Sequence, residues 1–274
     1  MQVLRRLFAG SVVALLAATT VFAQANAQPK RKKILAIGEV KGFQHDSVSH
    51  ALASVERWGR ESGLWDTYIR TDTQLVTKKK LEGNAKNLDF FDAVVFYTTG
   101  ELPLDEEQKA SLLAFVKDDG KGFIGIHSAT DTLYQWPEYG ELIGGWFDQH
   151  PWNTFQAPII VEDSDHPATR HLPKSFTTRD EIYQFKSWSR DKVRVLMRLD
   201  ETKLEKNPKV HRTDGDFAVT WIKSYGSGRV FYSTLGHVEE AYDKPDIKKM
   251  YFEGIKWALG MSEGHTNPHP KKSD

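Results

Sequence analysis

The stretch Gly122-Phe123-Ile124-Gly125-Ile126-His127-Ser128-Ala129 decides the fold class. Its first five residues form a short apolar run, which is typical of a strand buried on both faces in a parallel sheet. A histidine and a serine follow at once and give the outline of a sharp turn from a strand into a helix. Because ligands bind beyond the carboxyl ends of such strands, His127 and Ser128 are the first candidates for a functional site.

Strands and helices alternate upstream of this stretch. Apolar or mixed runs predict strands over residues 33–38, 65–70 and 91–97. Apolar residues at helical spacing predict one helix after a cap at Asp46 or Ser47. A second helix begins at Asp105, with Gln108 in the capping-box position. This alternation predicts an α/β fold with a parallel sheet and right-handed crossovers.

The second half of the chain is less regular. Strand-like stretches lie over residues 158–161, 183–185, 193–198, 217–223 and 229–234. The glycines of Gly226-Ser227-Gly228 predict a hairpin turn between the last two strands. Pro245 is a good first-turn residue for a final helix that reaches Ala258. No internal repeat and no dividing linker is present in the sequence, so residues 28–260 are expected to form one domain.

The two ends of the chain are expected to lie outside this domain. Residues 1–27 have two arginines, an uncharged apolar stretch and two small-residue cleavage patterns, which end at Ala23 and Ala27. Together these features predict a signal peptide and export to the periplasm or beyond. An uncleaved membrane anchor is the alternative, and the paired arginines also fit a fragment of a twin-arginine signal. Residues 261–274 are polar and are expected to be a flexible tail.

Composition excludes several classes of function. The chain has no cysteine, so disulfides, thiolate metal sites and cysteine nucleophiles are ruled out. Lys plus Arg and Asp plus Glu both total 37, which argues against nucleic-acid binding. Removal of two arginines with residues 1–27 leaves 35 basic against 37 acidic groups, a net charge of −2. We therefore expect no nucleic-acid partner, and no membrane partner after signal cleavage.

Histidines follow several of the predicted strands. His45, His127 and His237 each come shortly after a strand, and a doubly wound sheet would bring such positions together. Glu39 and Asp131 also follow strands. On a strand, Glu181 and Tyr183 would point the same way because they are two residues apart.

Aromatic residues and further histidines lie between the strands. Trp136, Trp146 and Trp152 could offer flat faces to a sugar, or could simply pack in the core. His150 lies within the same segment. His166 precedes a proline, so it either lines the site or fixes a turn.

Two kinds of catalysis remain open for these residues. His45, His127, His150 and His237 could hold zinc or another divalent ion, or could act as acids and bases without one. Ser128 could act as a nucleophile with His237 as its base, although a helix N-cap is the alternative role for Ser128.

The sequence resembles the ThuA-like (trehalose-utilisation) family of the class I glutamine amidotransferase-like superfamily. The matching stretches include Gly42-Phe43-Gln44-His45-Asp46-Ser47, the segment 122–129, Gly144-Gly145-Trp146-Phe147-Asp148-Gln149-His150-Pro151, Asp165-His166-Pro167, Asp180-Glu181-Ile182-Tyr183, and the segments 225–230 and 235–237. The resemblance runs from residue 33 to about residue 260.

The resemblance implies a flavodoxin-like three-layer sandwich with a mainly parallel central sheet. In the amidotransferases a cysteine occupies the turn where this chain has His127, and a His-x-Glu pair completes the triad, as His237-Val238-Glu239 would here. Without a thiol, glutamine hydrolysis by the covalent route is excluded. The fold therefore does not carry that function across.

The resemblance also implies a substrate, namely a disaccharide or glycoside, or the 3-keto form of such a sugar. We expect acid–base or metal-assisted sugar chemistry; a non-catalytic carbohydrate-binding or accessory protein is the alternative, and a hydrolase using Ser128 is a third. The oligomeric state stays open. The expected catalytic residues are His45, His127, His150, Glu181, Tyr183 and His237, and the expected substrate-binding residues are Glu39, Ser128, Asp131, Trp146, Trp152 and His166.

Overall fold

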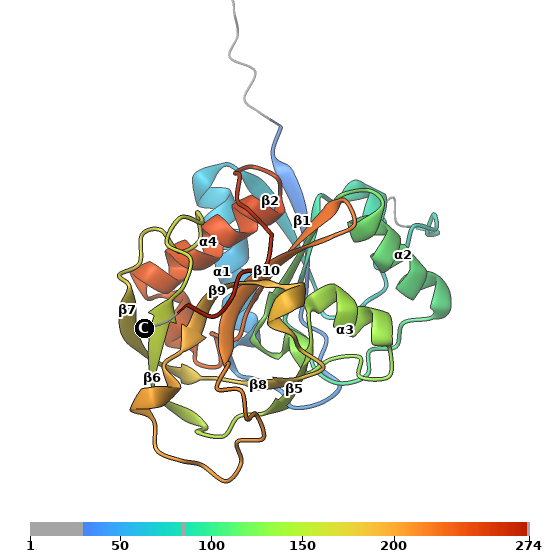
Figure 1. Cartoon of the computed structure of the whole chain (residues 1–274). Coiled ribbons are helices and arrows are strands. Elements are labelled where there is room, and N and C mark those ends of the chain that lie inside the picture. Colours follow the sequence, from blue (N-terminus) through green and yellow to red (C-terminus); the bar gives the residue numbers. More distant parts are fainter. Residues whose placement is uncertain (1–29, 84–85, 273–274) are drawn as a thin grey trace, which may run out of the picture. The chain divides into compact units, whose positions relative to one another are not determined.

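The protein is built around a central β-sheet with helices on both faces (Figure 1). The computed structural model describes residues 30–83 and 86–272, so the predicted signal peptide lies outside the described residues. The strands are β1 (Lys32–Ile37), β2 (Trp65–Arg70), β3 (Ala93–Phe96), β4 (Gly122–Ile126), β5 (Trp146–Gln149), β6 (Thr154–Val161), β7 (Ser175–Glu181), β8 (Gln184–Lys186), β9 (Arg194–Leu199), β10 (Ala218–Tyr225) and β11 (Gly228–Ser233). The α-helices are α1 (Ser47–Ser62), α2 (Glu106–Lys117), α3 (Pro137–Ile143) and α4 (Pro245–Ala258), and the short 3₁₀ helices are Leu88–Phe90, His127–Thr130, Arg190–Lys192, Glu201–Lys203 and Glu239–Tyr242.

Within the described residues, the main sheet has nine strands in the order β2-β1-β3-β4-β11-β10-β9-β6-β7. The first five of these strands are parallel to one another. From β11 onward each neighbouring pair is antiparallel, so β10, β9, β6 and β7 extend the parallel part. The α/β sandwich class predicted from the sequence is confirmed, and the antiparallel extension adds to it.

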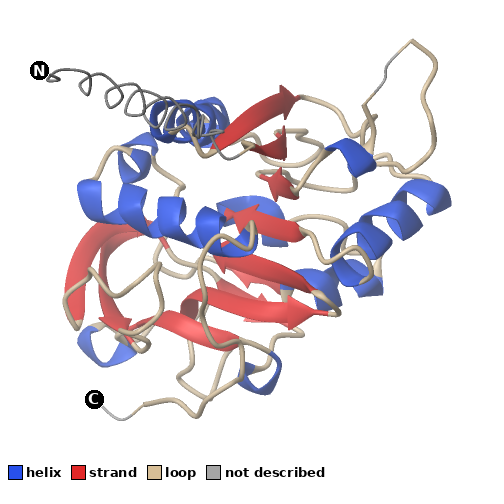
Figure 2. Cartoon of the chain, turned by 90° about the horizontal axis from the view of Figure 1, so that it is seen from above, coloured by secondary structure: helices blue, strands red, loops and turns tan. Residues whose placement is uncertain are grey.

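Alternate residues of the buried strands face two separate cores. Ile34 and Ala36 of β1 pack with α1 and α4, whereas Leu35 and Ile37 pack with α2 and α3. Figure 2 shows the two helix pairs on opposite sides of the strands. A strand that is apolar on both faces needs this arrangement, which explains the three layers.

Helix starts follow the sequence in one case and depart from it in another. Asp105 and Gln108 form the predicted capping box of α2. Asp46 precedes α1 but makes no side-chain cap. The Ser47 hydroxyl instead contacts the Tyr97 hydroxyl at 2.6 Å and donates to the Gly236 carbonyl at 2.9 Å. The predicted cap is therefore wrong, because these hydroxyls tie α1 to the loop after β11.

Two strands lie where the sequence predicted none. β5 lies in a segment for which the sequence predicts no strand, and it pairs with β8 in a separate two-stranded sheet. β7 has the sequence Ser-Phe-Thr-Thr-Arg-Asp-Glu and pairs along its whole length with β6. The polar residues of β7 do not predict a strand, which forms because of its pairing with β6.

The segment after α4 has no helix or strand within residues 261–272. The Arg194 guanidinium donates to the Asn267 carbonyl at 3.0 Å, and Thr266 shares a hydrogen bond with Ser224. His269 Nε2 lies 2.9 Å from the Val195 carbonyl. These contacts hold the polar segment against β9 and β10, and its mobility stays a prediction. Over the described parts of the chain, none of the helices combines the length and the apolar character needed to cross a bilayer.

Candidate active site

Four side chains from distant parts of the sequence meet beyond the carboxyl ends of the parallel strands. His45 follows β1, His127 follows β4, Glu181 ends β7 and His237 follows β11. One ligand atom from each of them lies within 4.8 Å of the other three. His45, His127 and Glu181 are buried, and His237 is partly buried. We call these four residues the His₃Glu cluster.

His127 stands at a strained turn. Its φ angle is +43°, in the left-handed region that non-glycine residues rarely adopt. Nδ1 lies 2.5 Å from the Thr234 carbonyl and Nε2 lies 2.7 Å from the Tyr183 hydroxyl. Because a carbonyl only accepts, Nδ1 carries the proton and the lone pair of Nε2 accepts the Tyr183 hydroxyl. The turn thus aims Nε2 at the centre of the site.

Glu181 is the anionic centre of the cluster. Its Oε2 lies 3.2 Å from His237 Nδ1 and 3.6 Å from His127 Nε2, and its Oε1 lies 3.5 Å from His150 Nδ1. Burial acts to raise the pKa of Glu181, but the neighbouring imidazoles of His127 and His237 outweigh burial and hold that pKa well below the usual range. Glu181 is therefore a carboxylate.

The cluster contains two histidines whose pKa values are shifted in opposite directions. Burial, followed by the charges of His127 and His237, lowers the pKa of His45 to about 3. The hydrogen bond to Glu181 raises the pKa of His237. The site thus pairs an imidazole that stays neutral with one whose protonated form is favoured, which is the combination that general base and general acid catalysis need.

The loop that carries His237 is fixed from two sides. The fully buried Asp180 carboxylate accepts from the N–H groups of Gly236 at 2.8 Å and His237 at 3.0 Å. The hydroxyls of Tyr97 and Tyr242 donate to the Gly236 carbonyl at 2.9 and 3.0 Å. Burial raises the pKa of Asp180, against the effect of His127 and these N–H donors. Sequence reasoning did not assign Asp180 a role, because only the folded loop shows what it binds.

The pairing of His237 differs from the amidotransferase pattern. His237 pairs with Glu181, whereas Glu239 is exposed at the start of a 3₁₀ helix. The expected His-x-Glu pair is therefore replaced by a partner from β7.

Other predicted site residues lie around the cluster. Tyr183 contacts His127, and His150 reaches Glu181 from a position where its side chain is 35% exposed. Asp131 accepts a hydrogen bond from the Tyr134 hydroxyl at 2.6 Å, and burial raises the pKa of Asp131.

Ser128 is fully buried directly beside His127. It lies inside the 3₁₀ helix His127–Thr130, whose N-cap is Ile126, so the predicted capping role is wrong. Its hydroxyl oxygen has no hydrogen-bond partner within residues 30–83 and 86–272.

Three predicted substrate-binding side chains pack elsewhere, namely Trp146, Trp152 and His166. Trp146 covers Gly140 and stacks on Tyr134. Trp152 contacts Phe155 and Phe217. Likewise Trp136, the third candidate sugar platform, is buried.

His166 is the third of these side chains. It packs against Trp257, and its Nδ1 accepts from the Ala168 N–H at 3.2 Å. This contact corresponds to the turn-fixing role rather than to the site-lining one.

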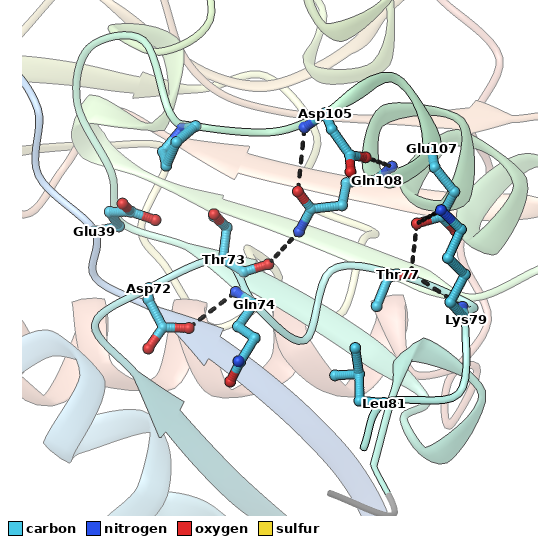
Figure 3. A pocket seen from close by; sticks show the side chains of 11 residues that line it. Glu39, Asp72, Thr73, Gln74, Thr77, Lys79, Leu81, Asp105, Glu107 and Gln108 are labelled. Atoms are coloured by element: carbon cyan, nitrogen blue, oxygen red, sulfur yellow. Dashed lines mark hydrogen bonds and ion pairs between the residues drawn. The ribbon is translucent and has the colours of Figure 1, made fainter. Parts of the chain in front are cut away.

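Glu39 belongs to a separate cavity of about 420 Å³. Figure 3 shows Glu39 at one side of this cavity and Lys79 with Glu107 at the other. Glu39 Oε1 pairs with Lys41 at 3.2 Å, while its Oε2 is buried without a hydrogen-bond partner among the described residues. None of the His₃Glu cluster lines this cavity.

Phe43 is an exposed aromatic side chain next to the cluster. It is 66% exposed, and its ring meets the His45 ring edge-on at 4.8 Å. The Thr99 hydroxyl donates to the Phe43 carbonyl at 2.9 Å and holds the loop. Sequence reasoning quoted this residue within a motif but gave it no role, since its exposure is a property of the fold.

Comparison with known proteins places these features in a family. The family model ThuA, described as trehalose utilisation, matches residues 33–258. A ThuA-like protein from Bacteroides uniformis is 21% identical, with a TM-score of 0.68, and the match covers 88% of this chain and 95% of that chain. A ThuA-like protein from Parabacteroides merdae is 18% identical, with a TM-score of 0.63 and coverage of 84% and 90%. At these identities the structures show a shared fold, and no curated protein matches the chain.

Proposed function

The chain belongs to the ThuA family of trehalose utilisation, and from this premise we propose that it is an exported enzyme that performs acid–base chemistry on a disaccharide or 3-keto glycoside. Family membership indicates a role in carbohydrate metabolism. The reaction and the substrate are our inference from the site.

The convergence of His45, His127, Glu181 and His237 carries this proposal. In a 3-keto glycoside the hydrogen on C2 is acidic because it is next to the ketone. A neutral imidazole takes this proton, and the electron pair forms a C1–C2 double bond as the glycosidic C1–O bond breaks. His237, with its proton held by Glu181, is placed to protonate the leaving oxygen. Isomerisation of the keto sugar would use the same base.

Phe43 supports a sugar as the ligand. Pyranose rings present a face of C–H groups that packs on aromatic rings. An exposed phenyl ring costs free energy in water, and this ring lies 4.8 Å from the His45 ring. A sugar ring that covers Phe43 would therefore lie beside the proposed base.

A panel of trehalose, sucrose and their 3-keto forms tests the reaction. We expect turnover of at least one keto glycoside by the wild type, and loss of turnover with retained binding in His127→Ala. His171→Ala is the matched control, because this partly buried histidine contacts α4 at the Asp246 carbonyl and is outside the cluster. Sugar binding without turnover by the wild type would favour the alternative, a non-catalytic carbohydrate-binding or accessory protein.

Export is a separate part of the proposal. Residues 1–27 have the composition of a signal peptide, which implies a periplasmic or secreted protein with a small-molecule carbohydrate as its partner. Expression of the full chain followed by N-terminal sequencing of the exported fraction tests this, with cleavage after residue 23 or 27 expected. An intact N-terminus in a membrane fraction would contradict it.

A further inference from the structure

We propose that the His₃Glu cluster is a metal site that binds one zinc ion through three imidazole nitrogens and one oxygen of Glu181. The inference goes beyond the proposed function, because His45 and His237 cannot take or give a proton while they bind an ion, and the two are tested separately. Imidazole and carboxylate are strong zinc ligands, and no cysteine competes in this chain.

The spacing of the donor atoms fits a zinc ion if the ligand side chains move slightly inward from their present positions. Zinc–nitrogen distances of about 2.0–2.1 Å place tetrahedral donor atoms about 3.4 Å apart. The four donor atoms here all lie within 4.8 Å of one another. His237 Nδ1 and Glu181 Oε2 are already 3.2 Å apart. A shift of roughly an ångström in the remaining side chains closes the site.

An unpartnered nitrogen gives independent support. Nδ1 of His45 is buried and has no hydrogen-bond partner among the described residues. His45 is only 6% exposed, and its ring meets those of His127 and His237 edge-on at 4.8 and 5.2 Å. A buried polar atom without a partner is costly. Three imidazoles around one carboxylate leave this nitrogen unsatisfied, and a cation at the centre would satisfy it.

The surroundings orient the ligands as outer-shell groups do at metal sites. The His127 Nδ1–H faces the Thr234 carbonyl, which leaves Nε2 as the binding nitrogen. Asp180 holds the backbone of His237. The Tyr183 hydroxyl now occupies the Nε2 lone pair, so metal binding must displace this hydrogen bond.

His150 is excluded from the ligand set by the same geometry. Its Nδ1 pairs with Glu181 Oε1 at 3.5 Å, whereas His127 and His237 face Oε2, and His150 is not among the residues whose donor atoms converge. His150 therefore acts on the carboxylate, and Glu181 replaces it among the four candidates that the sequence offered. When bound, the ion would take a keto or hydroxyl oxygen of the sugar as a fifth ligand and polarise it.

The test uses the purified protein, stripped with a chelator and titrated with Zn²⁺ alone by calorimetry. We expect one ion per chain and a zinc-dependent rise in the melting temperature. His45→Ala and Glu181→Gln should each weaken binding at least 100-fold, whereas His150→Gln should change it less than 10-fold. Circular dichroism of the metal-free variants verifies that they are folded.

Two results would overturn the site: no stoichiometric zinc binding by the folded wild type, or an equal loss in His150→Gln and Glu181→Gln. The site and the proposed function can fail separately. Bound zinc without turnover of any glycoside contradicts the function alone. Turnover by a folded wild type that binds no zinc contradicts the metal site alone.

Discussion

The Tyr183 hydroxyl lies 2.7 Å from Nε2 of His127, the one nitrogen of that ring which does not face a backbone carbonyl. Tyr183 is buried, and burial, followed by the negative charge of Glu181, raises its pKa well above the usual value. The phenol is therefore a hydrogen-bond donor at neutral pH. It competes directly with any metal ion or substrate proton for the His127 lone pair.

Tyr183→Phe removes this competitor and leaves the ring in place. A hydrogen bond of this kind contributes about 1 kcal/mol, so we expect zinc affinity to rise about fivefold. Calorimetry on the chelator-treated variant measures it. A weaker affinity would mean that Tyr183 supports the bound state, contrary to the competition described here.

Phe43 should contribute to substrate binding and little to the chemical step. Phe43→Ala should raise KM about five- to tenfold, since an aromatic contact contributes about 1 kcal/mol, and should leave kcat within twofold. Phe43→Tyr should restore KM. Ile69→Ala on β2 is the control, because Ile69 is the other large exposed apolar residue among those described. Steady-state kinetics with an unchanged KM for Phe43→Ala would remove this residue from the binding site.

Asp180 is a positioning residue, since it holds the backbone of His237 rather than the ligand. Asp180→Asn turns an amide N–H₂ group toward backbone donors, which should cost about 2–3 kcal/mol of stability. We expect kcat to fall at least tenfold with a small change in KM. Asp92→Asn is the matched control, because Asp92 also accepts a backbone N–H, from Lys33, but precedes β3 at its amino end. Equal losses of kcat in both variants would reduce Asp180 to a structural role.

The sequence was sufficient for features that depend on local pattern. β1, β4 and α4 follow from apolar periodicity and end signals within one segment. β7 was missed because its polar residues become a strand only through pairing with β6. The stability of such a strand depends on its partner strand, and a local sequence pattern carries no information about that partner.

The site divides in a similar way. His45, His127 and His237 were predictable because parallel strands end at a common edge. The partner of His237 was not, since Glu181 arrives from β7 at the far end of the sheet order. Phe43 and Asp180 were missed because their roles depend on the folded structure: Phe43 is exposed and Asp180 is buried, and a local sequence pattern shows neither property.

Ser128 separates a hydrolase from the acid–base enzyme proposed here. Its hydroxyl is buried without a partner in the described part of the chain, so Ser128→Ala removes an unsatisfied polar group. We expect stability to stay the same or to rise by about 1 kcal/mol, with full activity retained. Chemical denaturation and steady-state assays measure the two quantities. A loss of activity of 1,000-fold or more in the folded variant would restore the nucleophile hypothesis.

His166 should make stability depend on pH at a place remote from the His₃Glu cluster. It is 2% exposed against Trp257, and burial lowers its pKa from 6.5 to about 4. The unfolded chain therefore binds a proton near pH 6.5 that the folded chain refuses until about pH 4. The stabilisation from this residue is complete above pH 6.5 and is lost as the pH falls toward 4, by about 3 kcal/mol in total.

His166→Asn keeps an acceptor for the Ala168 N–H but does not titrate. Its unfolding free energy, measured by urea denaturation at pH 7, 5.5 and 4, should fall less steeply than that of the wild type. The variant starts from lower stability because the ring contact with Trp257 is lost, so the comparison uses the slope with pH. Asp163 and His45, whose pKa values also differ from their usual ones, are present in both proteins and cancel in the difference. Parallel pH profiles for the two proteins would show that His166 takes its proton as readily in the fold as in the unfolded chain.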